Sequence, residues 1–243
     1  MTDPGMDAAE AARIQAVYAR RHRDRRYDWE SPGHLFIMQE LEQRMLRMLA
    51  RHGCLPLAAR RILEVGCGTG HFLRELVKWG ADPARVVGID VIEERLAAGR
   101  ARSPAGMRFE CRNAADTGLA PGSFDLVLQM TVFTSILSPD IRRRTADEML
   151  RLLAPGGRII WYDFRVDNPR NPDVRGVGKA EIHRLFPGCT IDARSVTLVP
   201  PLARSIARRS RLLCLALSAV PVLRTHYLAV IGRDESQPDV RRS

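Results

Sequence analysis

The sequence of 243 residues has no hydrophobic run approaching the roughly 20 residues that a membrane-spanning helix needs. Its amino terminus, MTDPGMDAAE, is acidic and lacks the apolar core of a secretory signal peptide. Cysteine is sparse and scattered, without a C-x-x-C pair or the spacing of a metal site. We therefore expect a cytoplasmic protein with reduced thiols and no bound metal.

Lysine is almost absent, because Lys78 and Lys179 are the only two, and arginine supplies nearly all of the positive charge. A formal net charge of +10 raises nucleic acid as a partner. The arginines, however, are spread from Arg13 to Arg242 among abundant alanines, a pattern that codon bias in a GC-rich genome produces. Nucleic-acid binding is therefore the less favoured interpretation.

Short apolar segments alternate with amphipathic ones from Arg60 onward, which predicts an α/β fold with a parallel sheet covered on both faces. The length fits one such domain with a modest extension. We expect strands at 61–65, 85–89, 107–111, 124–129 and 157–162. We expect helices between them at 71–79, 92–101 and 140–153.

Both ends of the chain depart from this alternation. Residues 1–12 read as a tail, 13–28 as a basic helix or helix and loop, and 34–52 as an amphipathic helix. Near the other end, a helical stretch at 202–218 separates two further strands at 190–199 and 225–232. We expect a helical extension or lid at 1–57, a main domain at 58–235 and a tail at 236–243.

The segment ILEVGCGTG, residues 62–70, places three glycines directly behind a predicted strand. Ligands of open parallel sheets bind beyond the carboxyl ends of the strands, where glycines let bare backbone approach them. The third glycine comes one residue too early for the dinucleotide fingerprint, and no Gly-Lys-Ser/Thr follows as in a phosphate-binding loop. Asp90, at the end of VVGID, suits the two hydroxyls of a ribose.

Four motifs follow one another along the chain: ILEVGCGTG, VVGID, CRNAADTGLAPGSFDLVLQM and EMLRLLAPGGRIIWYD. They resemble the motif set of class I S-adenosylmethionine-dependent methyltransferases, over about residues 58–165. The resemblance implies a Rossmann-like seven-stranded sheet of order 3-2-1-4-5-7-6, with the last strand antiparallel and helices on both faces. It also implies S-adenosylmethionine as the cofactor and S-adenosylhomocysteine as the product.

The same resemblance assigns roles to matched positions. Glu64 would help to fix the ammonium group of the cofactor, Asp90 the ribose hydroxyls, and Val91 would pack on adenine. Where the family often has an aspartate for the adenine amino group, this sequence has Asn113 before Ala114, so that either Asn113 or Asp116 makes this contact. The methionine part of the cofactor would lie along Gly66, Cys67 and Gly68 and be bordered by Gln129. Gly70 and Ala114 are further candidates for contact with the cofactor.

Simpler interpretations stand beside these. The glycines could form a plain tight turn, Cys67 could be only a small loop residue, Val91 and Ala114 could belong to the core, and Glu64 could cap the following helix.

Candidates for the acceptor site come from the carboxyl edge of the sheet. Asp163 and His226 are the candidate general bases, although Asp163 could pair with an arginine and His226 could be a satisfied strand-end histidine. The segment 27–34 could fold across the site as a lid or simply anchor the following helix. Further candidates for contact with the acceptor are Tyr27, His34, Thr131, Phe133, Tyr162 and Arg165.

Residues 204–223, RSIARRSRLLCLALSAVPVL, combine arginines with a 12-residue apolar run. This stretch predicts either peripheral contact with a membrane or a helix that packs on the sheet. We expect O-methylation of a small-molecule, glycan- or lipid-linked acceptor in a bacterial biosynthetic pathway. The alternatives are an N-methyltransferase acting on a small amine or RNA and a non-catalytic regulator that binds the cofactor; the oligomeric state is left open.

Overall fold

The computed structural model describes residues 4–20, 29–168 and 171–234. A seven-stranded sheet of order β3-β2-β1-β4-β5-β7-β6 lies at its centre, as predicted. The first five strands run parallel, and β7 is antiparallel to both β5 and β6. The strands are β1 (Ile62–Val65), β2 (Val86–Asp90), β3 (Arg108–Cys111), β4 (Phe124–Met130), β5 (Leu153–Phe164), β6 (Cys189–Leu198) and β7 (Arg224–Arg233).

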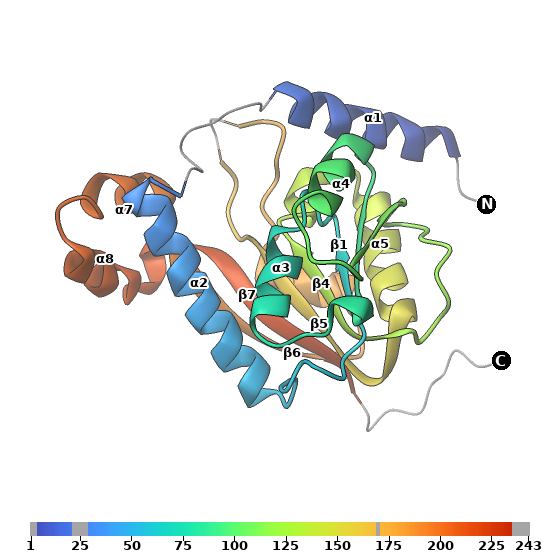
Figure 1. The fold of residues 1–243 in the computed structure, drawn as a ribbon. Coiled ribbons are helices and arrows are strands. Elements are labelled where there is room, and N and C mark those ends of the chain that lie inside the picture. The colour runs from blue at the N-terminus through green and yellow to red at the C-terminus, as the bar shows by residue number, and fades with distance from the viewer. Residues whose placement is uncertain (1–3, 21–28, 169–170, 235–243) are drawn as a thin grey trace.

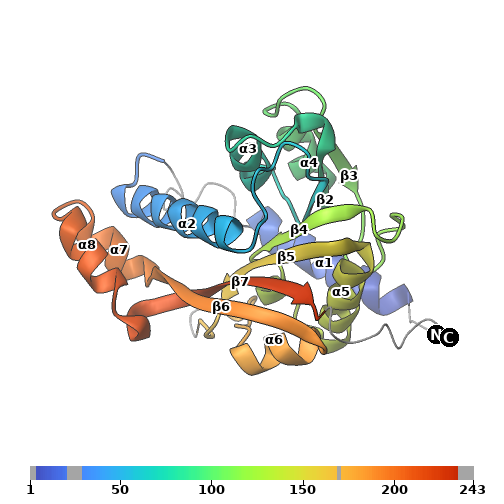
Figure 2. The same cartoon turned by 90° about the horizontal axis from the view of Figure 1, so that it is seen from below.

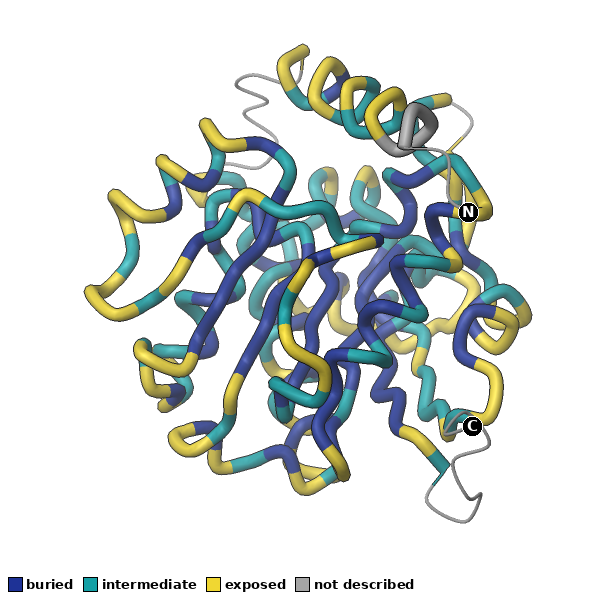
Figure 3. Tube along the Cα trace, turned by 90° about the vertical axis from the view of Figure 1, so that its right-hand side faces the viewer, coloured by how far each residue is buried: buried dark blue, intermediate teal, exposed yellow. Residues whose placement is uncertain are grey.

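Helices cover both faces of this sheet (Figure 1, Figure 2). One face packs against α2 and α3, and the other against α5 and α6. The central strands are buried along most of their length, whereas α1 is exposed along most of its outer side (Figure 3). The helices are α1 (Pro4–Arg20), α2 (Pro32–Arg51), α3 (His71–Lys78), α4 (Glu93–Arg100), α5 (Pro139–Leu152), α6 (Lys179–Leu185), α7 (Pro200–Ile206) and α8 (Arg211–Ser218).

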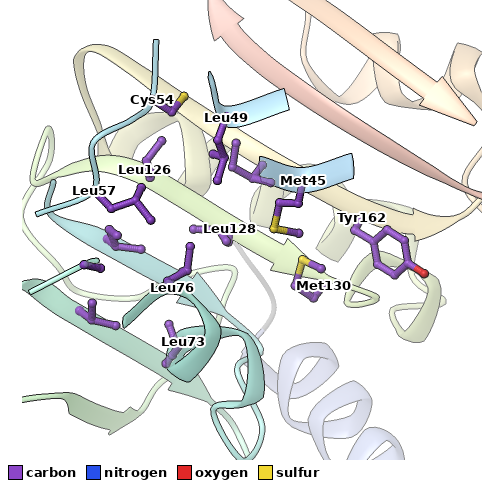
Figure 4. Close-up of a cluster of buried hydrophobic side chains, with 14 of the residues drawn as sticks. Met45, Leu49, Cys54, Leu57, Leu73, Leu76, Leu126, Leu128, Met130 and Tyr162 are labelled. Carbon is purple, nitrogen blue, oxygen red and sulfur yellow. The ribbon is translucent and has the colours of Figure 1, made fainter. Parts of the chain in front are cut away.

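Helix α2 follows from its apolar spacing. Pro32 occupies the first turn, where its missing N–H has no partner to lose, and Leu41, Met45 and Leu49 recur every four residues on one face. Met45 points toward Met130 of β4, with Tyr162 of β5 alongside (Figure 4). The helix thereby covers the central strands next to the edge where they end.

Three predictions of local structure were wrong, and one helix was not predicted. Residues 4–12 belong to helix α1 rather than to a tail. The segment at 153–157 is the start of β5, which shifts register against β4 between Phe124 and Leu126, and is not a helix end. The helical stretch 202–218 is two helices, and α6 was not predicted. Within the described residues no helix is long and apolar enough to cross a membrane.

Candidate functional site

The loop between β1 and α3 turns on glycines in the left-handed region, with φ of +65° at Gly66, +53° at Gly68 and +70° at Gly70. Side chains are disfavoured there on conformational grounds. Space is also missing, because a Cβ on Gly66 would lie 2.5 Å from Cγ2 of Val132 and one on Gly70 would lie 2.6 Å from Cε1 of Phe109. A Cβ on Gly68 would meet the guanidinium group of Arg95. The three glycines are therefore required by this loop.

Asp90 ties the end of β2 to this loop. Its Oδ2 accepts a hydrogen bond of 2.8 Å from the N–H of Gly68, and its Oδ1 accepts one of 3.0 Å from the N–H of Ile92. An ionised carboxylate offers about four acceptor sites, so each oxygen keeps one for another donor. Asp90 is buried and lines a cavity beside the glycine loop, which we call the main cavity.

Glu64, in β1, carries a buried carboxylate oxygen, Oε2, that has no hydrogen-bond partner within residues 4–20, 29–168 and 171–234. Burial, with the Asp90 carboxylate nearby, raises the pKa of Glu64 to about 8. Glu64 also lines the cavity. An unpartnered buried carboxyl group is costly unless a donor or a cation satisfies it, so the residues present fit a ligand with a cationic group at this point.

The cavity has a volume of about 240 Å³ and lies beyond the carboxyl ends of β1, β2 and β4. Val91, Asn113 and Ala114 line it, whereas Asp116 is exposed and does not. Asn113 Oδ1 accepts a hydrogen bond of 2.9 Å from the N–H of Ala115, which leaves one lone pair on that oxygen. Between the two residues that the sequence left open, the structure brings Asn113 to the cavity.

Helix α1 forms a roof over this cavity through Glu10, Ala11, Ile14 and Tyr18. Two loops hold it there: Glu10 accepts a 2.6 Å hydrogen bond from the N–H of Leu137, and Gln15 donates one of 2.9 Å to the carbonyl of Val91. Arg13 pairs with Glu10 and donates a hydrogen bond to the carbonyl of Ser135.

The loop after β4 forms another wall, with Met130, Thr131 and Val132. Thr131 has φ of 61°, a strained value for a residue that is not glycine. Gln129 lies behind the wall rather than in it: its Oε1 accepts a 3.0 Å hydrogen bond from the N–H of Val132. Gln129 therefore positions the loop.

Asp163 and His226 do not line the cavity. Asp163 accepts hydrogen bonds from the N–H and hydroxyl of Thr134 and from the N–H of Phe164, so that it holds the turn after β4. Burial raises its pKa to about 6. His226 stacks on Tyr162 at 4.6 Å between ring centroids, and burial lowers its pKa to about 3. The structure thus places both candidate bases in packed surroundings.

Three other residues that the sequence suggested for contact with the acceptor make contacts within the protein instead. Phe133 is fully buried against Trp161, with ring centroids 4.5 Å apart. The hydroxyl of Tyr162 lies 2.9 Å from Oγ1 of Thr197, and Arg165 donates a 2.8 Å hydrogen bond to the carbonyl of Arg224. None of the three side chains lines the main cavity, because each faces a partner within the fold.

The proposed lid at 27–34 is described in part, and Tyr27 lies outside the described residues. Trp29 packs against two imidazole rings, with ring centroids 5.3 Å from those of His34 and 5.4 Å from those of His71. His34 itself does not line the cavity. The roof is formed by α1 instead.

His71, the first residue of α3, was missed as a candidate. It lines the main cavity and also a second cavity of about 280 Å³ between α2 and α3. Its Nε2 is buried and has no hydrogen-bond partner among the described residues, and burial lowers its pKa below the usual value. Residues lining the second cavity include Trp29, Leu35, Met38, Gln39, Phe72 and Trp79.

The sequence contained a signal both for the roof residues of α1 and for His71, which the sequence analysis did not identify as parts of the site. Ala11, Ile14 and Tyr18 recur at spacings of three and four, as on one face of a helix, but this pattern begins within the stretch that reads as a tail. His71 stands where the dinucleotide fingerprint has its third glycine. Its position therefore marked it as a residue beside the ligand.

Comparison with known proteins agrees with this geometry. Residues 62–157 match a family described as a methyltransferase domain. A demethylmenaquinone methyltransferase of Clavibacter sepedonicus is 35% identical over 131 residues, which are 53% of this chain and 50% of that protein. A ubiquinone biosynthesis O-methyltransferase of Thiobacillus denitrificans is 29% identical over 204 residues, which are 82% of this chain and 81% of that protein.

The chain spans about half the length of most of the curated relatives it matches. Among solved structures, the 1,6-didemethyltoxoflavin-N1-methyltransferase of Burkholderia thailandensis is similar, with a TM-score of 0.61 and 19% identity. The match covers 96% of this chain and 92% of that one, whose structure holds 1,6-didemethyltoxoflavin and S-adenosylhomocysteine. The likeness confirms the predicted fold.

Proposed function

Because the chain belongs to the class I S-adenosylmethionine-dependent methyltransferases, we propose that it methylates a hydroxyl group of a small-molecule, glycan- or lipid-linked acceptor in a bacterial biosynthetic pathway. The observation that carries the proposal is the pair of buried carboxylates, Glu64 and Asp90, in one cavity behind the glycine loop. Glu64 has an unpartnered oxygen for a cationic group, and Asp90 has free acceptor positions for hydroxyls.

S-adenosylmethionine carries both of these groups. In our proposal, Glu64 takes its ammonium group, Asp90 takes its ribose hydroxyls, and Asn113 accepts from the adenine amino group. Val91 and Ala114 would flank the adenine, with Ile14 and Tyr18 of α1 above the cavity. Gly66 and Cys67 would lie along the methionine part, since they form the floor of the cavity near Glu64.

The cofactor supplies a methyl group that its sulfonium charge has already activated. When bound, the cofactor would supply this methyl group to the acceptor oxygen and leave as S-adenosylhomocysteine, and the hydroxyl proton would pass to a base of the protein. The protein must align the acceptor, exclude water and receive that proton. We infer that His71 is this base, in place of Asp163 and His226.

Two features of His71 support this assignment. Its Nε2 is unpartnered, and its lowered pKa keeps the ring neutral near pH 7, the form that accepts a proton. His71 also lines both cavities, as the neighbouring Phe72 does, so that its ring lies between them.

We propose that the second cavity receives the acceptor. The rings of Trp29, Phe72 and Trp79 would stack on a flat aromatic molecule, and the unpartnered Oε1 of Gln39 would accept from one of its hydroxyls. Peripheral membrane contact through residues 204–223 is a separate proposal, which would explain how a lipid-linked acceptor reaches the site. Oxygen is favoured as the methylated atom because several curated relatives are named O-methyltransferases.

Calorimetric titration with S-adenosylmethionine and S-adenosylhomocysteine tests the cofactor assignment. Hydroxybenzoates and hydroquinones are then incubated with enzyme and cofactor, and products are examined for a gain of about 14 daltons, the mass of one CH₂. A methylated product that is absent with His71→Gln supports the whole proposal. Cofactor binding without any methylated hydroxyl compound would contradict the acceptor assignment, and a folded protein that binds neither molecule would contradict the function itself.

A further inference from the structure

Exposed apolar side chains gather at one place on the protein. Of the large hydrophobic residues that are exposed in the described part of the chain, five lie on α8 and in the short 3-10 turn η4 (Pro221–Leu223) or just before it. Leu212 is 78% exposed and Val222 is 77% exposed. We call this set the α8 surface: Leu212, Leu213, Leu215, Val220 and Val222.

These side chains are not needed to hold α8 in place. The inner side of the helix is buried through Cys214 and Ser218, which are four residues apart, and Cys214 packs with Ala203 of α7. Leu217 packs beside this inner side, whereas Leu212, Leu213 and Leu215 are exposed and point away from the fold. Contiguous exposed apolar residues of this kind mark interaction sites more often than isolated ones do.

The charged side chains of the segment that carries the α8 surface have one sign. No aspartate or glutamate occurs between Asp192 and Asp234, while seven arginines do. Arg208, Arg209 and Arg211 are exposed directly before the leucines of α8. Apolar side chains beside a cluster of arginines match a surface with anionic headgroups over hydrocarbon, whereas a second copy of this surface would bring like charges together.

The α8 surface lies on the catalytic side of the sheet. The segment containing α7 and α8 joins the end of β6 to the start of β7, and His226 near that start pairs with Phe164 at the carboxyl end of β5. This is the edge at which Thr131 lines the main cavity. Helix α7 packs on the beginning of α2, where Gly33 abuts Arg204 (Figure 1).

We propose that the α8 surface docks on an anionic lipid bilayer, with the leucines and valines in the headgroup layer and the arginines against lipid phosphates. Docking here would hold the carboxyl edge of the sheet, beyond which the main cavity lies, near the membrane surface. A lipid-linked acceptor would then reach the second cavity without crossing open water. Delivery of the acceptor rests on the proposed function, whereas docking itself does not.

Co-sedimentation with vesicles tests the proposal, using phosphatidylcholine alone or mixed with equal parts of phosphatidylglycerol. We expect the full chain to sediment with the anionic vesicles and to remain in solution with the neutral ones. Leu212→Glu/Val222→Glu should lower the bound fraction about tenfold, and Arg208→Ala/Arg209→Ala should weaken binding and its dependence on salt. Cofactor binding, measured separately by calorimetry, should be unchanged in both variants.

The matched control is Ala84→Glu/Ala105→Glu, which adds the same charge at exposed alanines before β2 and β3, at the opposite edge of the sheet. This variant should still bind the anionic vesicles. Wild type that stays in solution with these vesicles would overturn the proposal, as would a control that loses binding as fully as the α8 variant. A dimer that Leu212→Glu/Val222→Glu converts to a monomer in sedimentation velocity would instead assign the surface to a second copy.

Discussion

The carboxylate of Asp90, at the end of β2, accepts a hydrogen bond of 2.8 Å from the backbone N–H of Gly68, in the loop after β1. The bond joins the two loops that enclose the cavity and fixes the carboxylate before any ligand binds. A site organised in this way spends little binding free energy on ordering its own groups. Asp90 therefore supports the glycine loop, and in our proposal the same carboxylate binds the ribose.

Replacing Asp90 by alanine should remove the acceptor for the ribose hydroxyls and loosen Gly68. We expect the affinity for S-adenosylhomocysteine to fall about 100-fold, since hydrogen bonds to a charged group contribute about 1.5–3 kcal/mol each. Calorimetric titration measures this loss. Asp116→Ala is the control, because Asp116 is exposed near the same cavity and should retain binding. Equal losses in the two variants would contradict the assignment.

Gly66→Ala should combine backbone strain with the contact to Val132, which lies 2.5 Å from the added Cβ. Strain alone costs about 1–2 kcal/mol. Gly53→Ala separates the two effects, because Gly53 has φ of +64° but nothing within 4 Å of an added Cβ. We expect thermal melts to show destabilisation in both variants, and titrations to show loss of cofactor binding in Gly66→Ala alone. Unaltered binding by Gly66→Ala would refute this account of the loop.

The raised pKa of the buried Glu64 carboxyl group can be tested by comparing the stability of the wild type and Glu64→Gln at different pH values. The pKa of Glu64 rises from the ordinary 4.5 to about 8 in the folded protein. Between these values the folded state binds more protons than the unfolded state, so the wild type loses stability as pH rises through this window. We expect the melting temperature of the wild type, compared with that of Glu64→Gln at the same pH, to fall by at least about 3 °C between pH 5 and pH 8.

The same carboxyl group should release a proton when the ammonium group of the cofactor binds. Titrations at pH 7 in buffers with different ionisation enthalpies should therefore reveal proton release by the wild type but not by Glu64→Gln. Glu94→Gln, an exposed change on α4, is the control and should behave as the wild type. Identical proton release by the wild type and Glu64→Gln would show that another group titrates.

Arg13→Ala should loosen the roof, because Arg13 pairs with Glu10 and binds the carbonyl of Ser135. We expect S-adenosylhomocysteine to dissociate about fivefold faster, in line with the loss of a partly buried charged hydrogen bond of roughly 1 kcal/mol. Stopped-flow measurements give this rate. Arg20→Ala, whose exposed side chain lies 4.0 Å from Asp173, should leave dissociation unchanged. No difference between the two variants would mean that α1 does not retain the cofactor.

His71→Gln should lower kcat about 100-fold on a phenolic acceptor while cofactor affinity changes little. The pKa of His71 lies below its usual value, so the wild-type rate should be constant above about pH 7 and fall on acidification as the ring protonates. Rates measured from acid to alkaline pH check this profile. His52→Gln is the control, since His52 pairs with Asp192 away from both cavities. A pH profile that is the same for His71→Gln and the wild type would exclude His71 as the base.

The sequence by itself determined the sheet and the glycine loop. Alternating apolar segments are local signals, and all seven strands appear within a few residues of the predicted places. The glycine positions were equally readable, because the left-handed backbone at Gly66, Gly68 and Gly70 is a property of single residues. The order of the strands was predicted from the resemblance of the sequence motifs to those of class I methyltransferases.

Tertiary structure alone decided which side chains face the cavities. The roof depends on contacts between residues far apart in sequence, such as Gln15 with Val91 and Arg13 with Ser135. Asp163 and His226 do lie at the predicted edge of the sheet, yet both point into packed surroundings. An edge follows from the order of strands, but the direction of a side chain depends on what packs around it, and that partner is fixed only when the whole chain has folded.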